Sequence, residues 1–233
     1  MTTSLVPLTM ATVDLLPERC RSCVTWELPG AAAAVTSAGD AAFEKEVWLS
    51  GVMLTWGSAG QIVLVDDKPV GFVLYAPPTA VPAASAFPTA PVSPDAVLLT
   101  TARIRDDRLG QGLGRFLLNG AVVALARRGV RAIELFGRED TAAAPTNPVD
   151  PDGAARPDNR PAIPNCLVPA GFARAVGFTD VRVHPRYPRL RFEITGESGW
   201  KAEVESALER LFTAITVPTA PVREPARQAV GVR

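Results

Sequence analysis

Between a strand-like segment and a helix-like segment the chain reads Leu109-Gly110-Gln111-Gly112-Leu113-Gly114-Arg115. Three glycines at alternate positions leave main-chain N–H groups uncovered, so a phosphate group can approach them closely. A helix that begins here adds the partial positive charge of its N-terminus. The stretch therefore predicts a phosphate-binding turn.

Apolar patterns on both sides support a strand, a turn and a helix in this order. Residues 96–104 are rich in β-branched and apolar side chains and are long enough for a largely buried strand. After the turn, apolar residues recur at helical spacing as far as Arg127 and Arg128, and Gly129 is a stop signal. The helix positions expected to face the core are Leu113, Phe116, Leu117, Ala121, Ala124 and Leu125.

Two common glycine-rich motifs do not fit this stretch. A Walker loop needs Gly-Lys-Ser/Thr after its second glycine, and the chain has none here. A dinucleotide-binding fingerprint needs the spacing G-x-G-x-x-G and an acidic residue about 20 positions on. The chain has G-x-G-x-G and lacks the acidic residue at that place.

The stretch resembles motif A of the GNAT N-acetyltransferase superfamily, written Arg/Gln-x-x-Gly-x-Gly/Ala, which holds the pyrophosphate of acetyl-CoA. Gly112 and Gly114 match the two small positions, whereas Leu109 stands where the family has Arg or Gln, with Arg108 beside it. The segment Phe172-Ala173-Arg174-Ala175-Val176-Gly177-Phe178 resembles the family's helix that ends in Gly-Phe before a strand. The arginine-, alanine-, valine- and proline-rich composition is typical of a GC-rich genome such as an actinobacterial one.

The resemblance implies an α/β (α+β) fold of the GNAT type. This fold has a mixed, mostly antiparallel central sheet flanked by helices, with the acetyl-CoA site at the strand, glycine turn and helix. We expect an acetyltransferase domain over residues 1–195, with loops at 76–95 and 137–164, and a C-terminal helix and mobile tail over 196–233. The expected strands are 5–9, 61–65, 70–75, 96–104, 132–136, 180–183 and 189–194, and the other expected helices lie in 10–23, 41–56, 172–178 and 199–213.

The second of these helices has its own start signal and apolar face. Asp40 is expected to cap a helix that runs from Ala41 to about Trp56 and ends at Gly57. Its expected apolar face comprises Phe43, Val47, Leu49, Val52, Met53 and Leu54.

Acetyl-CoA is the only cofactor that the resemblance implies for the reaction. In the family the pantetheine arm pairs with main-chain groups of the strand before the turn, and the turn holds the diphosphate. The residues expected to bind the cofactor are Ala102, Arg103, Ile104, Leu109, Gly110, Gln111, Gly112, Leu113, Gly114, Arg115 and Asn165.

The family chemistry is direct attack of an amine on the thioester, often with a tyrosine that protonates the leaving thiolate. Ala173 occupies the usual tyrosine position, and Cys166, next to Asn165, the usual asparagine position. Tyr187 is therefore the candidate acid, with packing as its alternative role, Glu46 is a candidate base, and Cys166 is the third candidate catalytic residue. Other candidate bases are Glu27, Glu44 and Glu134. Charge on a solvated face also explains each of the four glutamates, and water can serve as the base.

Cysteine and histidine suggest a separate hypothesis. Cys20 and Cys23 form a C-x-x-C pair, Cys166 is the only other cysteine, and His184 is the only histidine. Together they are a Cys₃His set that suffices for tetrahedral zinc. A redox-sensitive pair and reduced, buried thiols are the alternatives.

The last predicted hairpin is rich in arginine. We consider that its arginines select an acidic acceptor or bind the 3′-phosphate of the donor, or are solvated charges on a strand face. These residues are Arg182, Arg186, Arg189 and Arg191.

Charge and hydropathy exclude several classes of function. The 24 basic and 24 acidic residues balance, which argues against nucleic acid or an anionic membrane as a partner. No apolar run approaches the roughly 18 residues of a membrane span, and the first residues lack a signal-peptide pattern, so we expect a cytoplasmic protein. We predict transfer of an acetyl group to a small-molecule or protein amine; the alternative is a non-catalytic module that binds CoA or a partner. The acceptor and the oligomeric state stay open.

Overall fold

One sheet organises the part of the chain that the structure describes, residues 2–28, 37–139 and 166–194 of a computed structural model. Its strands are β1 (Thr3–Pro7), β2 (Gly60–Val65), β3 (Lys68–Ala76), β4 (Ala96–Ile104), β5 (Ala132–Arg138), β6 (Val168–Pro169), β7 (Thr179–Arg182) and β8 (Arg189–Glu193). They lie in the order β1-β2-β3-β4-β5-β8-β7, with β6 beside β5. Neighbours are antiparallel except for β4 with β5 and β5 with β6, so the predicted mixed, mostly antiparallel sheet is confirmed.

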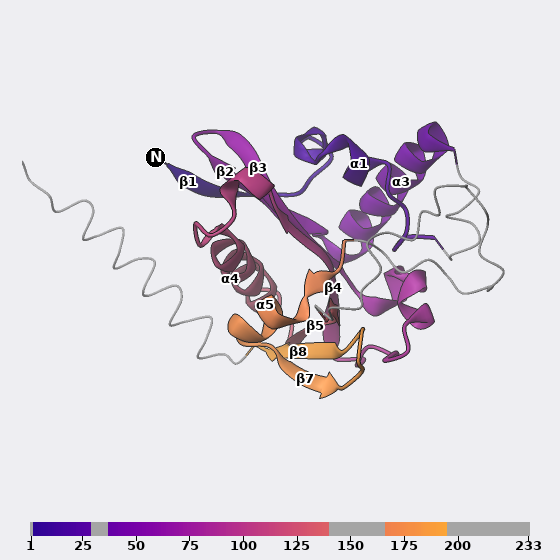
Figure 1. Ribbon diagram of the computed structural model, residues 1–233. Coiled ribbons are helices and arrows are strands. Elements are labelled where there is room, and N and C mark those ends of the chain that lie inside the picture. Colours follow the sequence, from indigo (N-terminus) through magenta and orange to yellow (C-terminus); the bar gives the residue numbers. More distant parts are fainter. Residues whose placement is uncertain (1, 29–36, 140–165, 195–233) are drawn as a thin grey trace, which may run out of the picture.

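Helices cover both faces of this sheet (Figure 1). One face carries α1 (Glu18–Arg21) and α3 (Ala38–Trp56), and the other carries α4 (Leu113–Ala126) and α5 (Ala170–Ala175). Alternate strand residues feed the two cores, since Leu74 packs on the α3 side and Val73 on the α4 side. The short 3₁₀ helices are η1 (Val13–Leu15), η2 (Pro78–Ala80), η3 (Pro82–Ala86) and η4 (Asp106–Arg108).

The cap of α3 differs from the prediction. Ser37 is the N-cap, and its Oγ accepts a hydrogen bond from the main-chain N–H of Asp40 at 3.3 Å. Asp40 lies inside the first turn, where its carboxylate accepts a hydrogen bond from the Ser37 hydroxyl at 2.6 Å. Asp40 as the cap was therefore wrong, because the serine three residues earlier satisfies the same donor.

The apolar face of α3 was only partly predicted. Leu49 and Val52 are buried, but the side chains of Phe43, Val47 and Leu54 are 64%, 50% and 87% exposed. The face that meets the sheet runs through Ala41, Lys45, Leu49 and Val52. Lys45 is therefore buried, although the hydrophobic pattern did not place it on the apolar face of the helix.

The 76–95 segment was expected to be an extended loop outside the sheet. It instead contains η2 and η3, each with proline at a first helical position, and it supplies core residues. Phe87 stacks on both Trp26 and Phe136, with its ring centroid 5.2 and 4.2 Å from theirs. The burial of the Phe87 ring therefore makes the segment part of the core, although its proline-rich composition predicted an extended loop.

The prediction for α4 was close. Leu113, Leu117, Ala121 and Leu125 are buried as expected, and Gly129 follows the helix with a φ of 72°. Phe116 is exposed, and its predicted core position was wrong. Leu118 and Val122 are buried instead because the helix packs over the sheet on a wider stripe.

Parts of the predicted organisation lie outside the described residues. These are most of the 137–164 loop, Asn165, the helix over 199–213 and the tail. Among the residues that the structure describes, no helix combines the length and the apolar character needed to cross a membrane.

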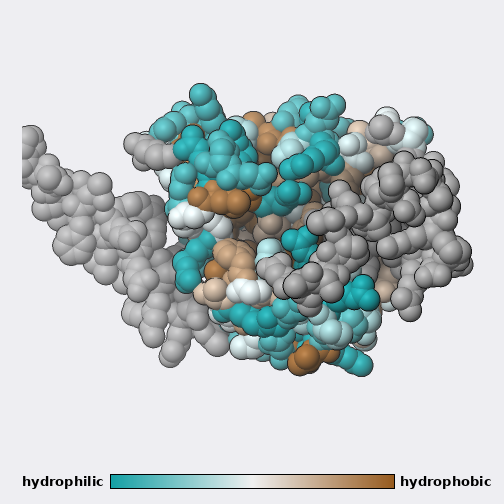
Figure 2. Space-filling view, in the orientation of Figure 1, coloured by the Kyte–Doolittle hydropathy of each residue, from teal (hydrophilic) through white to brown (hydrophobic). Residues whose placement is uncertain are grey.

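The surface seen in this orientation is mainly hydrophilic where residues are described (Figure 2). Hydrophobic residues on this side gather in small separate patches rather than in one broad apolar face.

Candidate functional site

Strand β4 loses one of its two neighbours partway along its length. It pairs with β3 from Leu98 to Ile104, but with β5 only at Ala96, Val97 and Leu98. The carboxyl end of β5 pairs with β6 instead. In the described part of the chain, the second half of β4 therefore has an edge without a strand partner, and an extended ligand with amide groups can pair with such an edge.

A β-bulge lies where the two strands separate. Leu74 pairs with Thr101 and Tyr75 with Leu99, so Thr100 is an extra residue, and its hydroxyl donates to the Leu74 carbonyl at 3.3 Å. Beyond the bulge, Thr101 and Arg103 lie on the same face as α1 and α3 and line a pocket there. The bulge thus directs these two side chains toward the pocket.

The glycine turn connects β4 to α4. Gly110 and Gly112 have φ values of 74° and 77°, which favour glycine, and a Cβ added to either residue would meet no atom within 4 Å. Gly112 is the N-cap of α4 and provides no side-chain cap. The first N–H groups of a helix have no partners within the helix. The turn therefore offers main-chain donors at a helix N-terminus beside open space, which is the geometry that binds phosphate.

The remaining residues of the turn have different environments. Leu109 and Gln111 are exposed, whereas Leu113 is buried in the core on the α4 side. A Cβ on Gly114 would approach the Phe172 ring to 3.0 Å, so this glycine permits close contact with α5. Arg115 donates a hydrogen bond to the Ala175 carbonyl at 2.9 Å, which also joins α4 to α5.

The two arginines before the turn, Arg105 and Arg108, differ in how closely they approach a carboxylate. Arg105 forms two hydrogen bonds to Asp107, at 3.0 and 2.8 Å. Arg108 approaches the same carboxylate only to 3.8 Å and forms no shorter ion pair within the described ranges. Arg108 therefore has a weaker carboxylate partner than Arg105 has.

A pocket of about 230 Å³ lies on the α1 and α3 face beside β4. We call it the β4 pocket. The described residues that line it are Arg19, Cys20, Cys23, Thr25, Trp26, Lys45, Phe72, Leu74, Thr101, Arg103 and Cys166.

All three cysteines of the chain line the β4 pocket. The Thr101 hydroxyl donates a hydrogen bond to the Cys166 Sγ at 3.5 Å. Burial raises the pKa of the Cys20 and Cys166 thiols above their ordinary value of 9.0, and for Cys20 the nearby Arg103 and Arg19 partly oppose this. Both thiols therefore carry their protons at neutral pH.

The predicted zinc set does not come together. The His184 Nδ1 accepts hydrogen bonds from the main-chain N–H groups of Arg186 and Tyr187 at 3.1 and 3.0 Å, and so serves its own turn. The described residues contain no group of three or more His, Cys, Asp or Glu side chains that could hold a metal ion. A zinc site at Cys20, Cys23, Cys166 and His184 is not supported.

Two of the predicted catalytic residues lie away from the described lining of the pocket. The Tyr187 ring is half-buried. Its centroid lies 6.0 Å from that of the His184 ring, on which it stacks, and 6.2 Å from that of the Phe87 ring, which it meets edge-on. Glu46 is exposed on α3, beside the buried Lys45. Only Cys166 of the three candidates lines the pocket, and the catalytic role of each stays a prediction.

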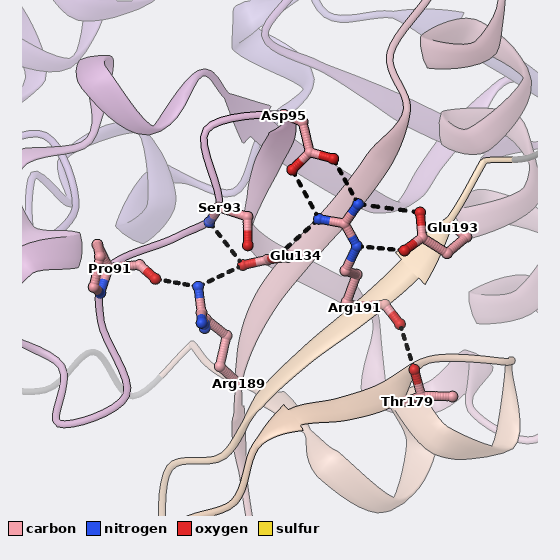
Figure 3. A network of polar contacts seen from close by, with 8 residues as sticks. All are labelled: Pro91, Ser93, Asp95, Glu134, Thr179, Arg189, Arg191 and Glu193. Carbon is pink, nitrogen blue, oxygen red and sulfur yellow. Dashed lines mark hydrogen bonds and ion pairs between the residues drawn. The ribbon is translucent and has the colours of Figure 1, made fainter.

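Two other carboxylates have structural partners. Glu27 accepts a hydrogen bond from the Lys45 ammonium, and both side chains are almost fully buried. Glu134 accepts from Arg191 at 3.1 Å, and from Arg189 at 2.9 Å and the Ser93 N–H at 3.2 Å (Figure 3). Both oxygens of Glu134 are occupied, so this residue is unsuited to be a base.

The same network decides the role of two hairpin arginines. Arg189 and Arg191 are largely buried and bind Glu134, and Arg189 also donates to the Pro91 carbonyl (Figure 3). Solvated charge on a strand face is therefore the wrong interpretation for these two residues, since the pattern of charges along one strand does not show which buried carboxylate lies opposite. Binding of an acidic acceptor or of the donor 3′-phosphate by the hairpin arginines stays a prediction.

Sequence reasoning missed several pocket residues. Lys45, Trp26 and Thr101 belong to no motif that the sequence shows. Each reaches the pocket from a different segment of the chain. Lys45 stands between Glu44 and Glu46 in the sequence, so no local signal distinguishes it from a solvated charge.

No protein-family model matches the chain, and no curated protein sequence matches it. Solved structures similar to it include the PaiA N-acetyltransferase from Thermoplasma acidophilum in complex with coenzyme A, at 11% identity and a TM-score of 0.48, covering 83% of this chain and 99% of that one. An N-acetyltransferase from Staphylococcus aureus Mu50 matches at 8% identity and a TM-score of 0.48, covering 84% and 100%. A GNAT-family acetyltransferase from Brucella melitensis in complex with acetyl-CoA matches at 10% identity and a TM-score of 0.42, covering 83% and 89%.

Proposed function

We propose that the chain transfers an acetyl group from acetyl-CoA to a primary amine. The observation that carries the proposal is that β4 and the turn after it connect three features. These are the N-terminus of α4 without a side-chain cap, the edge of β4 without a strand partner and the β4 pocket. A diphosphate, a chain of amides and a small reactive end are the successive parts of acetyl-CoA.

The residues present fit this substrate. The main-chain N–H groups around Gly112 provide a phosphate site, because added Cβ atoms at Gly110 and Gly112 would project into the open space beside it. Main-chain groups of Ala102, Arg103 and Ile104 would pair with the pantetheine amides along the free edge of β4. Thr101 and Cys166 then mark the pocket where the acyl end would meet the amine.

The proposed reaction requires only the two substrates. The amine nitrogen forms a bond to the thioester carbonyl carbon, the carbon–sulfur bond breaks, and the proton that nitrogen loses ends on the departing thiolate. Holding both reactants in one pocket supplies the catalysis through proximity. Tyr187, Glu46 and Cys166 are the candidates for moving the proton, and only Cys166 lines the pocket.

A glycine pair at the two ends of α4 tests donor binding. Gly112 and Gly129 both have left-handed φ values, of 77° and 72°, and open space around them. Gly112→Asp and Gly129→Asp should each lower the free energy of unfolding by about 1–3 kcal/mol through backbone strain. Only Gly112→Asp should weaken acetyl-CoA binding, by about 10-fold or more, because it places a negative charge at the phosphate site.

Isothermal titration calorimetry with acetyl-CoA measures this difference, and the Gly129 variant is the matched control. Equal affinities for the two variants would count against the phosphate site. Thiol release from acetyl-CoA across a panel of amines then separates the enzyme from the module that only binds CoA. Binding without thiol release for any amine would favour the module.

A further inference from the structure

We infer that the acceptor held by the β4 pocket is a small amine that also carries a carboxylate, such as a free amino acid. This inference rests on the proposed function and adds the class of acceptor to it. Three observations support it: the charge of the lining, the size of the pocket and the lack of a carboxylate in its described lining.

The described lining is cationic. It contains Arg19, Lys45 and Arg103 and no aspartate or glutamate. Glu27 compensates Lys45, because the two form a buried ion pair. Arg19 and Arg103 have no carboxylate partner within the described ranges, and both lie near the Cys20 sulfur, where their charge favours the thiolate.

Arginine is suited to recognise a carboxylate. Its planar guanidinium offers paired donors that match the two oxygens of a carboxylate. Arg103 extends from β4 and Arg19 from α1, so the two cations reach the pocket from separate elements. An anionic group on the acceptor would find two donors there, whereas a simple alkylammonium would be repelled.

The volume limits the size of the acceptor. Pockets for drug-sized ligands have volumes of about 300–1,000 Å³. At about 230 Å³ the β4 pocket is smaller, and Trp26, Phe72 and Leu74 provide apolar contacts for a short side chain. A small metabolite fits this space better than a bulky one.

The cationic lining of the β4 pocket also favours the proposed acetyl transfer. A cationic surrounding disfavours the ammonium form of a bound amine and so lowers its pKa. The neutral amine is the nucleophile that attacks the thioester carbonyl, which breaks the carbon–sulfur bond, and its proton passes to the thiolate. The carboxylate of the acceptor would thus bind the arginines while the pocket promotes loss of the proton from its nitrogen.

Matched pairs of acceptors test the inference on the full chain with acetyl-CoA. Each pair consists of an amino acid and the amine that lacks its carboxylate, such as alanine with ethylamine and 4-aminobutyrate with propylamine. Thiol release should show a kcat/KM about 10-fold or more higher for the amino acid of the preferred pair. Calorimetric binding of the same compounds to the CoA-loaded protein should show the same order without turnover.

Variants locate the preference. Arg103→Gln and Arg19→Gln should raise the KM for the amino acid by about 10-fold and should not raise the KM for the matched amine, because each substitution removes a cation that repels the alkylammonium. Arg21→Gln is the control, because Arg21 lies on the same short helix, pairs with Asp14 at 2.6 Å and is absent from the described lining.

The outcomes separate the two proposals. Equal binding and turnover of acids and matched amines would overturn the carboxylate inference, whereas acetyl-CoA binding and thiol release would still support the proposed function. Failure of acetyl-CoA to bind would overturn the proposed function. In that case, titration of amino acids and amines into the protein alone still decides whether Arg19 and Arg103 recognise a carboxylate.

Discussion

Lys45 lies on the side of α3 that faces the sheet because Glu27 compensates its charge. The two side chains are 3% and 1% exposed, and the Lys45 ammonium also lies 5.5 Å from the centroid of the Trp48 ring. The second carboxylate oxygen of Glu27 is buried without a hydrogen-bond partner among the described groups. Removing one member would leave the other as an uncompensated buried charge.

Glu27→Leu should therefore lower the free energy of unfolding by about 3–5 kcal/mol. The double variant Glu27→Leu/Lys45→Met should recover most of this loss, because it buries two apolar side chains of similar volume in place of two charges. Urea denaturation of both variants and the parent chain measures the effect. A double variant as unstable as Glu27→Leu would contradict this account of the pair.

The glycines of the turn illustrate how residues of one type differ in role. Gly112 has a left-handed φ beside open space, which favours glycine, whereas at Gly114 an added Cβ would lie 3.0 Å from the Phe172 ring, so a small residue there permits the close contact. The motif predicted small residues at both positions. The second reason became visible only when α5 was placed against α4.

At the scale of elements, the N-cap of α3 is Ser37, whereas the sequence pattern predicted Asp40. Ser37 and Asp40 form reciprocal hydrogen bonds, so the cap residue and the acidic residue three positions later stabilise the same helix start. The helix then ends at Gly57, whose φ is 88°. Both ends of α3 therefore have local signals.

Ser37→Ala should lower the free energy of unfolding by about 1 kcal/mol, because it removes the acceptor for a main-chain N–H of the first turn. Ser50→Ala, in the middle of the same helix, should change it by less than about 0.5 kcal/mol. Thermal and chemical denaturation of the two variants provide the comparison. Equal losses would show that the cap does not stabilise α3.

The bulge in β4 is an element-scale feature with a consequence for the site. The run of β-branched and apolar residues over 96–104 predicts a strand, but Thr100 is left out of the pairing with β3. Because of this one residue, Thr101 and Arg103 face the β4 pocket rather than the opposite core. No local pattern in the strand shows the bulge.

At the scale of the whole molecule, ion pairs join segments far apart in the chain. Arg191 binds Asp95 at 2.8 Å as well as Glu134 and Glu193, which connects β8 to the segment before β4 and to β5 (Figure 3). Arg174 of α5 binds Asp180 at 2.7 Å and Glu139 at 2.5 Å. These contacts hold the last hairpin and α5 against the centre of the sheet.

These pairs predict how stability depends on pH. Hydrogen bonding to Arg174 holds the pKa of Asp180 below its ordinary value of 3.8, and Arg191 does the same for Asp95. Since the unfolded chain binds protons more readily, this stabilisation is complete above pH 3.8 and is lost as the pH falls through the lower pKa of the folded state. Asp180→Asn should lower stability at neutral pH and make its decline in acid shallower.

Denaturation across the acid range, with Arg174→Gln beside Asp180→Asn, checks this prediction. Both variants should flatten the same part of the stability curve, because each removes one side of the same pair. Parallel curves for Asp180→Asn and the parent chain would show that the pair does not contribute to acid sensitivity.

The order of strand, turn and helix over residues 96–129 followed from the amino-acid sequence alone, because hydrophobic periodicity and left-handed glycines act within a few residues of each other. The neighbouring strands β2 and β3 also followed from their own apolar runs, and they are joined by a local turn at Asp66 and Asp67, whose φ values are 48° and 61°. The β4 pocket, the Lys45–Glu27 pair and the Glu134 network were decided only by the tertiary structure. Each depends on which distant segments meet, since a buried charge is stable only opposite a partner that no local pattern identifies.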